Sequence, residues 1–518
     1  MENKIFQLII GRLDGDRIAS QEYEEYIFRL VKSGIGGFIV FGGKKEEVKA
    51  FIGRIQTLSE IPLFVASDIE HGVAQQIGGA TLFPSQMAVA AAINRDDPAD
   101  VALLKEMLEA IACEADACGI NMPLIPVLDV NVNPDNPIIC TRAFSDDPEM
   151  VAWFGSEYIK ILEGSGLITC GKHFPGHGDT AVDSHIALPT IAKSYQELLE
   201  MDIFPYRQAI EDGVSSIMVG HLGVPAIDGK PASMSANIMS GLLRYKLGFN
   251  GLILTDALTM SALKDFGNIP VTCLNAGADI LLHPANVEET AREVMEAMKD
   301  GMLQEDRLDM VLMRIGRAKE RFRAYRAQSI RLGAVNHQSL IANHESETAE
   351  IDGGREAIVD YEKHRRISER ITEKAITLVK KRGEYLPVHN GGDVKVDFAG
   401  DDTYFLSSPL KAAFSNVSAS GEAEVSGRTL VLAVFTSVVA RKGSSGISPE
   451  QREQIARLID RAKHTIVISF GSPYVLRYFE NADVLIAAYD PTEEAQRAVI
   501  GCLLEAKPFK GRLPVKIF

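Results

Sequence analysis

The densest group of chemically active side chains lies in a glycine- and proline-rich segment, CGKHFPGHGDTAVDSHIALP, at residues 170–189. Its imidazoles and carboxylates are His173, His177, Asp179, Asp183 and His185. In an extended segment, residues at i and i+2 project to the same side. The Asp183 carboxylate can therefore accept a hydrogen bond from one ring nitrogen of His185 and fix the tautomer of the other. Such a pair is a usable general acid and base, although a D-x-H triplet alone is common in loops.

A second set of polar residues directly follows short apolar runs. Its members are Asp68, Glu70, Asp129, Lys172, His173, His221 and Asp256. Asp256 ends the run LILT, and an ionised carboxylate on a buried strand is costly unless it is hydrogen-bonded or has chemical work to do. The alternative is that Asp256 has a structural role and caps the helix that follows. A single residue of this kind indicates little, but polar groups at five strand ends favour a shared site.

Two chemistries suit these residues. In the first, Asp256 is the nucleophile and the Asp183–His185 pair is the acid and base of a two-step glycosyl transfer with an oxocarbenium-like transition state. In the second, a metal ion is held by His173, His177, His221 and Asp256. No strand offers an H-x-H pair and the Lys172 ammonium would repel a cation, which weakens the metal hypothesis but leaves both open.

Eight apolar, β-branched runs separated by helix-period segments predict the scaffold that positions these residues. The runs span 6–11, 36–43, 62–68, 121–130, 167–174, 215–222, 251–258 and 279–284. Eight βα units predict a (β/α)8 barrel, an α/β fold, over residues 1–325. Because the carboxyl ends of the strands of such a barrel meet at one face, the polar residues should line a single site.

The chain after the barrel divides into a connector and a second domain. Residues 326–365 are polar and weakly periodic, which indicates a connector. Residues 366–518 alternate apolar runs such as RTLVLAVFTS and HTIVISFG with helical segments. This alternation predicts a smaller α/β domain, an αβα sandwich.

Composition excludes several classes of protein. There are 54 Lys and Arg against 70 Asp and Glu, a formal net charge of −16, so neither nucleic acid nor a membrane is expected as a partner. The six cysteines form no CxxC pair, so neither a disulfide framework nor a zinc ribbon is indicated. The N-terminal apolar stretch of about six residues is too short for a signal peptide or a membrane span, which predicts a cytoplasmic protein.

Several segments resemble the family 3 glycoside hydrolases, and within them the N-acetyl-β-glucosaminidase branch. KHFPGHG at 172–178 followed by DSH at 183–185 is similar to the signature of that branch. LGFNGLILTDALTM at 247–260 is similar to its nucleophile segment, and further similar segments lie at 133–148, 204–221 and 231–244. The resemblance covers the whole barrel, and the second domain is similar to the sandwich that many members carry.

The resemblance implies a role for each matching residue. Asp256 would be the nucleophile that forms a covalent glycosyl–enzyme intermediate, and His185, oriented by Asp183, would be the general acid and base. Sugar hydroxyls would be held by Asp68, Arg142, Lys172 and His173, with lesser contacts from Met218 and His221. The resemblance implies neither a cofactor nor a metal.

The resemblance also implies a substrate. A retaining, exo-acting enzyme, monomeric or homodimeric, would release a terminal β-linked N-acetylglucosamine from muropeptides or chitooligosaccharides, as in peptidoglycan recycling. Members with the same dyad also transfer the sugar to phosphate, so a phosphorylase is the nearest alternative. A non-enzymatic carbohydrate-binding protein is disfavoured because Asp256, Asp183 and His185 are all present.

One barrel segment departs from the pattern of the branch. After the third strand the branch has D-x-E-G-G and a downstream arginine, whereas this chain has DIEHGVAQQ, so His71 and Gln76 replace glycine and arginine. Asp68 is retained, and with it the implied sugar contact. The departure affects the conformation of the neighbouring loop and the preference of the enzyme for the aglycone. His71 is either a subsite contact or a packing residue at a helix start.

The second domain offers one more alternative. In glucosidase members a loop of that domain lends a catalytic glutamate to the barrel, and the segment 441–451 places Glu450 at a similar position. Ser448 and Pro449 before it have the types of a helix N-cap and a first helical residue. We therefore expect Glu450 to begin an ordinary helix, and the domain to be a scaffold or a dimer contact.

Overall fold

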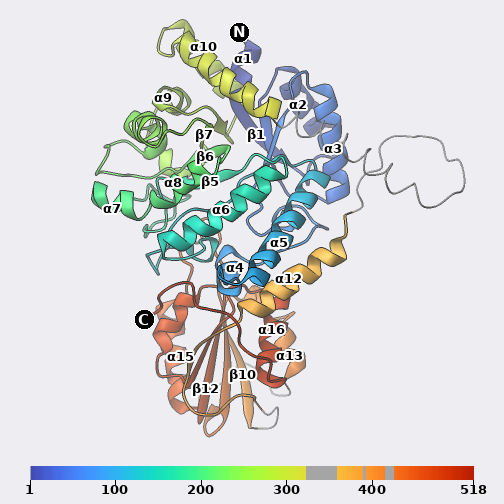
Figure 1. Cartoon of the computed structure of the whole chain (residues 1–518), viewed down its shortest axis with the longest axis vertical. Helices are drawn as coiled ribbons and strands as arrows, with labels where there is room; N and C mark the ends of the chain where they lie inside the picture. Colours follow the sequence, from blue (N-terminus) through green and yellow to red (C-terminus); the bar gives the residue numbers. More distant parts are fainter. Residues whose placement is uncertain (1, 322–358, 389–392, 415–424) are drawn as a thin grey trace, which may run out of the picture.

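The computed structural model describes residues 2–321, 359–388, 393–414 and 425–518. Its first part is the predicted (β/α)8 barrel, the upper part of the molecule in Figure 1. Eight parallel strands follow one another around it in chain order. The strands are β1 (Ile9–Asp14), β2 (Gly37–Phe41), β3 (Phe64–Ser67), β4 (Met122–Pro123), β5 (Cys170–Phe174), β6 (Ser216–Val219), β7 (Leu252–Thr255) and β8 (Leu281–Leu282). Single bridges close the ring, from Val127 to Lys172 and from Leu254 to Ile280.

The strand limits differ from the prediction most at β4, which is predicted over 121–130 but spans two residues. Pro123 and Pro126 lack an amide hydrogen, so the ladder cannot continue through them. The chain nevertheless follows the path of a strand, because the Leu128 amide donates to the Lys172 carbonyl at 2.7 Å. Asp129 therefore still reaches the carboxyl face of the barrel.

Helices cover the outside of the barrel (Figure 1). They are α1 (Glu2–Phe6), α2 (Gln21–Lys32), α3 (Lys45–Leu58), α4 (Gln86–Ala92), α5 (Pro98–Ala117), α6 (Pro148–Gly164), α7 (Tyr195–Glu200), α8 (Phe204–Glu211), α9 (Ile269–Ala276) and α10 (Val287–Lys299), with a π-helical stretch at Asn237–Lys246 and a further helix at 305–321. Helix α6 begins with Asp147 as N-cap, whose side chain accepts from the Glu149 amide, and Pro148 follows it. Both residue types favour a helix start at this point.

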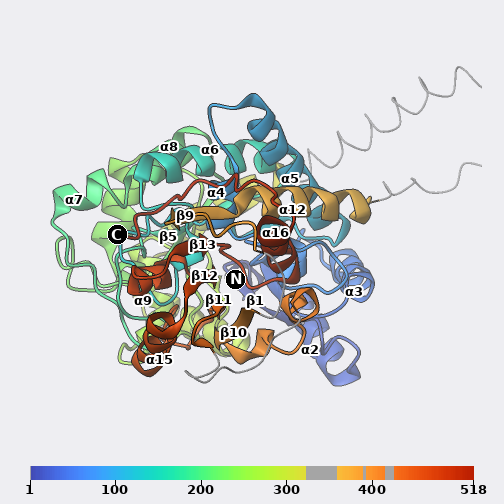
Figure 2. The ribbon, with the colours of Figure 1, turned by 90° about the horizontal axis from the view of Figure 1, so that it is seen from below.

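The second domain is an αβα sandwich, as predicted. Its sheet has the order β10 (Val394–Gly400), β11 (Thr429–Phe435), β12 (His464–Phe470), β13 (Val484–Ala487) and β9 (Thr377–Lys381), with only β9 antiparallel. Helix α15 (Pro449–Arg461) lies on one side of the sheet, and α13 (Pro409–Ala413) and α16 (Glu493–Leu504) lie on the other (Figures 1 and 2). The expectation for Glu450 is confirmed, because α15 begins with Ser448 as N-cap and Pro449 in its first turn.

The chain enters the second domain through α12 (Tyr361–Ala375), which crosses the predicted boundary at 365 and packs against α4 and α5 of the barrel. The His364 Nδ1 lies 2.7 Å from a buried Glu114 oxygen, and the Ser368 hydroxyl donates to the Leu82 carbonyl at 2.8 Å. The rest of the predicted connector, 326–358, lies outside the described residues.

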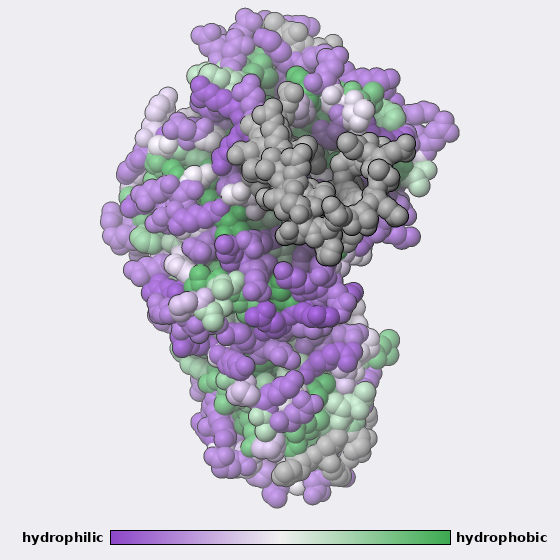
Figure 3. All heavy atoms as spheres, turned by 45° about the vertical axis from the view of Figure 1, so that its right-hand side comes forward, coloured by the Kyte–Doolittle hydropathy of each residue, from purple (hydrophilic) through white to green (hydrophobic). Residues whose placement is uncertain are grey.

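The C-terminal segment returns to the barrel, where the Arg512 amide donates to the Ala91 carbonyl at 2.9 Å. The two domains form an upper and a lower lobe that meet at a narrower waist, and hydrophilic side chains dominate the visible surface (Figure 3). Among the described residues, no helix combines the length and the apolar character needed to cross a membrane.

Candidate active site

The carboxyl ends of the barrel strands open into a cavity of about 820 Å³ that the second domain covers. Loops of the second domain at 436–441, 471–472 and 489–491 form the wall that faces the barrel. Most of the predicted site residues line this cavity, namely Asp68, Arg142, Lys172, His173, His185, Met218 and Asp256. The tertiary structure therefore brings these residues together from several strand ends, as a barrel requires.

A charged cluster surrounds Lys172, which is almost wholly buried on β5. Its Nζ lies 2.6 Å from Asp68 Oδ1 and 2.7 Å from Glu70 Oε1. Arg142 binds the same Glu70 carboxylate with its Nε and Nη2, each at 2.8 Å. Burial by itself raises the pKa of Glu70, but the two cations outweigh it and hold that pKa well below its ordinary value. Glu70 is therefore ionised, and the cluster holds rigid donors and acceptors of the kind that bind hydroxyl groups.

His173 is oriented by Asp129. Its Nδ1 lies 2.7 Å from Asp129 Oδ2, and its Nε2 lies 3.4 Å from Arg142 Nη2. A guanidinium can only donate, so Nε2 accepts there and Nδ1 carries the proton. Asp129 also accepts the amides of His173 at 3.2 Å and His177 at 2.7 Å, so it fixes both the tautomer and the backbone of this segment.

Asp183 and His185 meet as predicted, but through a different backbone geometry. His185 Nδ1 lies 2.9 Å from Asp183 Oδ1, and the His185 amide donates to the same oxygen at 2.8 Å. The chain here is a turn, closed by the Ile186 amide on the Asp183 carbonyl at 2.9 Å. The expectation of an extended segment is therefore wrong, and an aspartate-centred turn makes the contact instead. The Asp183 side chain is buried, whereas that of His185 is 30% exposed.

The KHFPGHG segment holds the loop that carries this dyad. His177 Nδ1 lies 2.6 Å from the hydroxyl of Thr180, which itself donates to the His177 carbonyl at 3.0 Å. Nδ1 is therefore the donor, and Nε2 accepts from the Ser184 hydroxyl at 3.1 Å. Burial lowers the pKa of His177 to about 4, so the ring is neutral at pH 7. At Gly178 a Cβ atom would lie 1.9 Å from the Val130 carbonyl oxygen, which only glycine avoids.

Asp256 follows β7 and lines the cavity. Its Oδ1 accepts the Ala257 amide at 2.7 Å. Burial by itself raises the pKa of Asp256, but the imidazoles of His173 and His221 and the Ala257 amide lower it below its ordinary value. Asp256 does not cap a helix, since the next one along the chain, at 261–263, has Met260 as N-cap. The site thus presents an ionised carboxylate that packing alone does not explain.

Comparison with known proteins identifies the family. A family model described as "Glycosyl hydrolase family 3 N terminal domain" matches residues 1–318. The chain therefore belongs to glycoside hydrolase family 3. The family resemblance drawn from the sequence is confirmed, and this family 3 protein is a glycoside hydrolase.

Individual relatives of this family 3 enzyme are similar over much of its length. Beta-hexosaminidase A of Pseudoalteromonas piscicida is 31% identical over 395 residues, which span 70% of this chain and 62% of that relative. A beta-N-acetylglucosaminidase/beta-glucosidase of Cellulomonas fimi is 26% identical over an alignment of 539 residues, which spans 96% of this chain and 91% of that relative. A solved family 3 beta-N-acetylglucosaminidase from Paenibacillus sp. str. FPU-7 superposes with a TM-score of 0.80 at 27% identity, covering 100% of this chain and 99% of that one.

His221 of this family 3 enzyme is wholly buried and, like Asp183, does not line the cavity. Its Nε2 lies 3.1 Å from the Ala257 carbonyl oxygen and its Nδ1 lies 2.7 Å from the Ser233 hydroxyl. Burial lowers its pKa, so the neutral ring donates through Nε2 and accepts through Nδ1. His221 therefore supports the turn that carries Asp256.

The proposed metal ligands do not assemble in the family 3 enzyme. His173, His177 and His221 each use both ring nitrogens in the contacts described above. Across the described ranges, no group of three or more His, Cys, Asp and Glu side chains is placed to hold a metal ion. The geometry consequently favours the glycosyl-transfer chemistry over the metal alternative.

Residues of the family 3 enzyme beyond the predicted set also shape the site. Glu70 and Asp129 are predicted only as polar strand ends, yet they hold the cations and His173 in place. His71 and Asp490 of the second domain both line the cavity, so the departure segment reaches this side of the barrel. Gln76 lines the cavity as well. The spacing of Asp68 and Glu70 after a strand could have identified Glu70 as a site residue from the sequence. No local pattern in the sequence places Asp490 beside the cavity.

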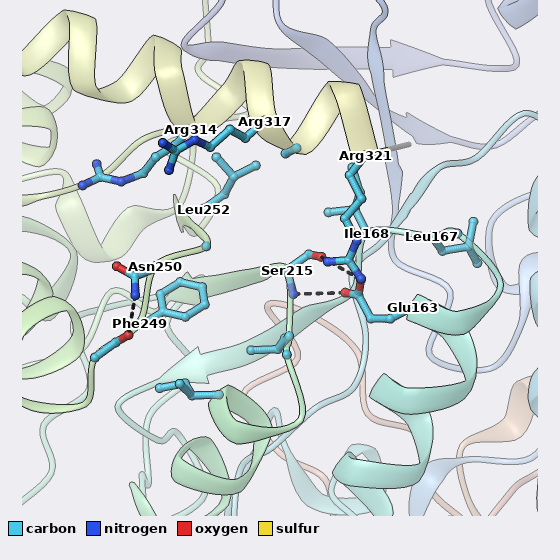
Figure 4. Close-up of a pocket in the computed structure, with 17 residues that line it drawn as sticks. Glu163, Leu167, Ile168, Ser215, Phe249, Asn250, Leu252, Arg314, Arg317 and Arg321 are labelled. Atoms are coloured by element: carbon cyan, nitrogen blue, oxygen red, sulfur yellow. Dashed lines mark hydrogen bonds and ion pairs between the residues drawn. The ribbon is translucent and has the colours of Figure 1, made fainter. Parts of the chain in front are cut away.

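A second pocket lies at the opposite, amino ends of β5, β6 and β7 (Figure 4). In it Arg321 reaches Glu163 at 2.9 Å, and Glu163 also accepts the Ser215 amide at 3.0 Å. Arg314 and Arg317 border the pocket from the same helix as Arg321. In (β/α)8 barrels the amino end serves stability rather than catalysis, so this pocket is separate from the active site of the family 3 enzyme.

Proposed function

We propose that this family 3 enzyme is a retaining, exo-acting β-N-acetylglucosaminidase. The observation that carries the proposal is the meeting of Asp256 and the Asp183–His185 dyad in one cavity, beside the charged cluster around Lys172. A nucleophile, an acid and base, and rigid donors for hydroxyls are what glycosyl transfer through a covalent intermediate requires. The names of the relatives, beta-hexosaminidase and beta-N-acetylglucosaminidase, support an N-acetylhexosamine as the sugar.

In the first step, ionised Asp256 attacks the anomeric carbon while the His185 imidazolium protonates the glycosidic oxygen. The bond from carbon to the leaving oxygen breaks as the bond to the aspartate forms, and the aglycone leaves as a neutral alcohol. Asp183 accepts from His185 Nδ1, which leaves Nε2 free to act on the substrate. The low pKa of Asp256 keeps it ionised for the attack.

In the second step, the now neutral His185 removes a proton from water, whose oxygen attacks the anomeric carbon from the face that the aglycone left. The bond to Asp256 breaks, the carboxylate regains its charge, and the sugar leaves with its original configuration. Two inversions at one carbon give retention, and the proton gained by His185 restores the acid for the next cycle.

The charged cluster supplies the sugar contacts in this proposal. Lys172 and Arg142 donate to hydroxyls of the terminal sugar, Asp68 accepts from them, and His173 completes the group. Because each is already fixed by a buried partner, little side-chain entropy is lost when the sugar binds. The second domain covers the cavity, which favours a chain end over the middle of a polysaccharide as substrate, of the muropeptide or chitooligosaccharide class.

The activity is tested with the 4-nitrophenyl β-glycoside of N-acetylglucosamine. Asp256→Ala is expected to lower kcat by about 10³-fold or more, since removal of a nucleophile leaves only binding and electrostatic effects. Glu450→Ala, which removes an exposed carboxylate at the start of α15, is the matched control and should keep wild-type turnover. Near-native turnover of Asp256→Ala would overturn the assignment.

A phosphate series decides between hydrolysis and phosphorolysis. With water as acceptor, the rate is expected to be independent of phosphate and the first product to be the free β-anomer, observed by NMR before mutarotation. A rate that rises strongly with phosphate, with a sugar 1-phosphate as product, would replace the hydrolase by the phosphorylase.

A further inference from the structure

The carboxylate of the acid and base dyad is held from both domains. Asp183 Oδ1 receives the Nδ1 and the amide of His185, and Asp183 Oδ2 receives the main-chain N–H of Arg441 at 2.6 Å. Arg441 lies 258 positions further along the chain, in the loop that follows β11 of the second domain. The carboxylate is buried, so this amide is a specific partner in place of water.

The backbone of Arg441 adopts a conformation that its residue type disfavours. Its φ is 70°, in the left-handed region, where the Cβ of an L-residue crowds the following carbonyl oxygen. A hydrogen bond from the Lys442 amide to the Val439 carbonyl at 3.2 Å closes the turn around it. At this turn position glycine and asparagine are the preferred residues. Such strain persists only where the surroundings determine the conformation, and here the contact with Asp183 is one of those surroundings.

The rest of the loop is fastened to the same part of the barrel. The Ser445 hydroxyl donates to the Asn136 carbonyl at 2.8 Å, and the Asn136 side-chain amide donates to the His177 carbonyl at 2.8 Å. Toward its own domain, the Ser437 hydroxyl donates to Asp401 at 2.8 Å. The loop thus links the core of the second domain to the segment that carries the dyad.

We propose that the second domain positions the acid and base, with the Arg441 amide as the positioning group for Asp183. With both oxygens occupied, the carboxylate has one orientation, and His185 keeps its Nε2 toward the glycosidic oxygen. Without the Arg441 amide the carboxylate can rotate, and the imidazole follows it away from the leaving group. The inference rests on the proposed function, and it assigns to the second domain a part in catalysis without any side chain that reacts.

The test uses the leaving group of the substrate in the full-length enzyme. A 2,4-dinitrophenolate leaves without a proton, whereas a sugar or alkyl aglycone needs one from the acid. Arg441→Pro removes the amide hydrogen, and proline cannot adopt a positive φ. We expect kcat/KM to fall about 10- to 100-fold for chitobiose but less than about 3-fold for the dinitrophenyl glycoside, so the plot of log kcat/KM against leaving-group pKa becomes steeper.

Arg441→Gly is the conservative control, because it keeps the amide and suits the left-handed conformation. Its leaving-group slope should equal that of the wild type. Ser445→Ala, which frees the same loop from Asn136 and keeps every amide, should steepen the slope in the same direction, and it decides the question if Arg441→Pro does not fold. The proposal is overturned if Ser445→Ala, and Arg441→Pro where it folds, keep the wild-type slope. It is also overturned if these variants lose the same factor in kcat/KM on all substrates.

His185→Ala separates this inference from the proposed function. If His185 is the acid, that variant is itself expected to show a steeper slope than the wild type, with losses of about 10²- to 10⁴-fold on chitobiose. A steep slope in His185→Ala with a wild-type slope in Arg441→Pro rejects only the role of the second domain. An unchanged slope in His185→Ala rejects the dyad itself.

Discussion

Glu70 decides the charge balance of the charged cluster around Lys172. It contacts two cations, Lys172 at 2.7 Å and Arg142 through two bonds of 2.8 Å, and its side chain is only 3% exposed. Without its charge, Lys172 and Arg142 would lose the carboxylate that they share and would repel each other in a low dielectric. A buried ion pair that loses one member is strongly destabilised because the other charge is left uncompensated.

Glu70→Gln is therefore expected to lower kcat/KM roughly 30- to 1000-fold. This corresponds to a loss of about 2–4 kcal/mol in the free energy of transition-state binding. Most of this loss should be a rise in KM, because donors misplaced for the hydroxyls weaken substrate binding in the ground state as well as in the transition state. The matched control is Glu362→Gln, which removes an exposed carboxylate that pairs with Arg366 on α12. Steady-state kinetics on the nitrophenyl glycoside check both, and a wild-type kcat/KM for Glu70→Gln would contradict the role given to this residue.

The loop from 175 to 190 is held in one conformation by hydrogen bonds and ion pairs. His177 ties it internally to Thr180 and Ser184, and Lys193 at its end binds buried Asp202 at 2.8 Å and Asp179 at 3.4 Å. Its geometry requires a neutral His177 that donates through Nδ1 and accepts through Nε2. The placement of the dyad therefore depends on pH through a residue that does not itself react.

This dependence predicts a loss of stability in mild acid. The folded-state pKa of His177 is about 4, below the ordinary histidine value of about 6.5, so the unfolded chain binds the proton more tightly. Its contribution to stability is complete above about pH 6.5 and is lost as the pH falls toward 4, by about 1.4 kcal/mol per pH unit. Between pH 6.5 and 5 the wild type should lose about 1.6 kcal/mol more than His177→Gln, measured by urea unfolding. Equal losses in the two proteins would show that His177 is not the group responsible.

The contacts between the two domains are buried as well as polar. Glu114 of α5 is wholly buried and accepts from His364 of α12 at 2.7 Å and from the Thr81 amide at 2.8 Å. The active-site cavity lies between the same two domains, so an interface that loosens should also loosen the cover of the cavity. Stability and activity are in this way coupled through α12.

Glu114→Ala is expected to destabilise the protein by about 2–4 kcal/mol, because it leaves a buried imidazole and a buried amide without partners. Urea unfolding should then separate into two transitions, one for each domain. Glu106→Ala is the control on the same pair of helices, since the exposed pair of Glu106 with Arg370 contributes at most about 1 kcal/mol. A single transition with unchanged midpoint in Glu114→Ala would show that α12 does not couple the domains.

Local patterns in the sequence are sufficient for the barrel, for the sandwich and for several of the polar residues in the cavity. Apolar runs predict strands because burial on a parallel sheet requires them, and a barrel brings the ends of its strands to one face whatever the loops contain. Residues such as Asp68, Lys172 and Asp256 could therefore be placed in one site from their positions alone. The short extent of β4 and the turn at Asp183 differ from expectation because proline and aspartate side chains override the strand pattern locally.

Only the tertiary structure decides which partners these residues have. The bond between Glu70 and Arg142, the burial of His221, the bond from the Arg441 amide to Asp183 and the position of Asp490 beside the cavity all join segments far apart in the chain. No periodicity or motif encodes such pairs, because they depend on how segments distant in the sequence pack, both within the barrel and between the two domains. Sequence alone therefore determines the chemistry available to this protein, and the packing of the second domain on the barrel determines how that chemistry is positioned.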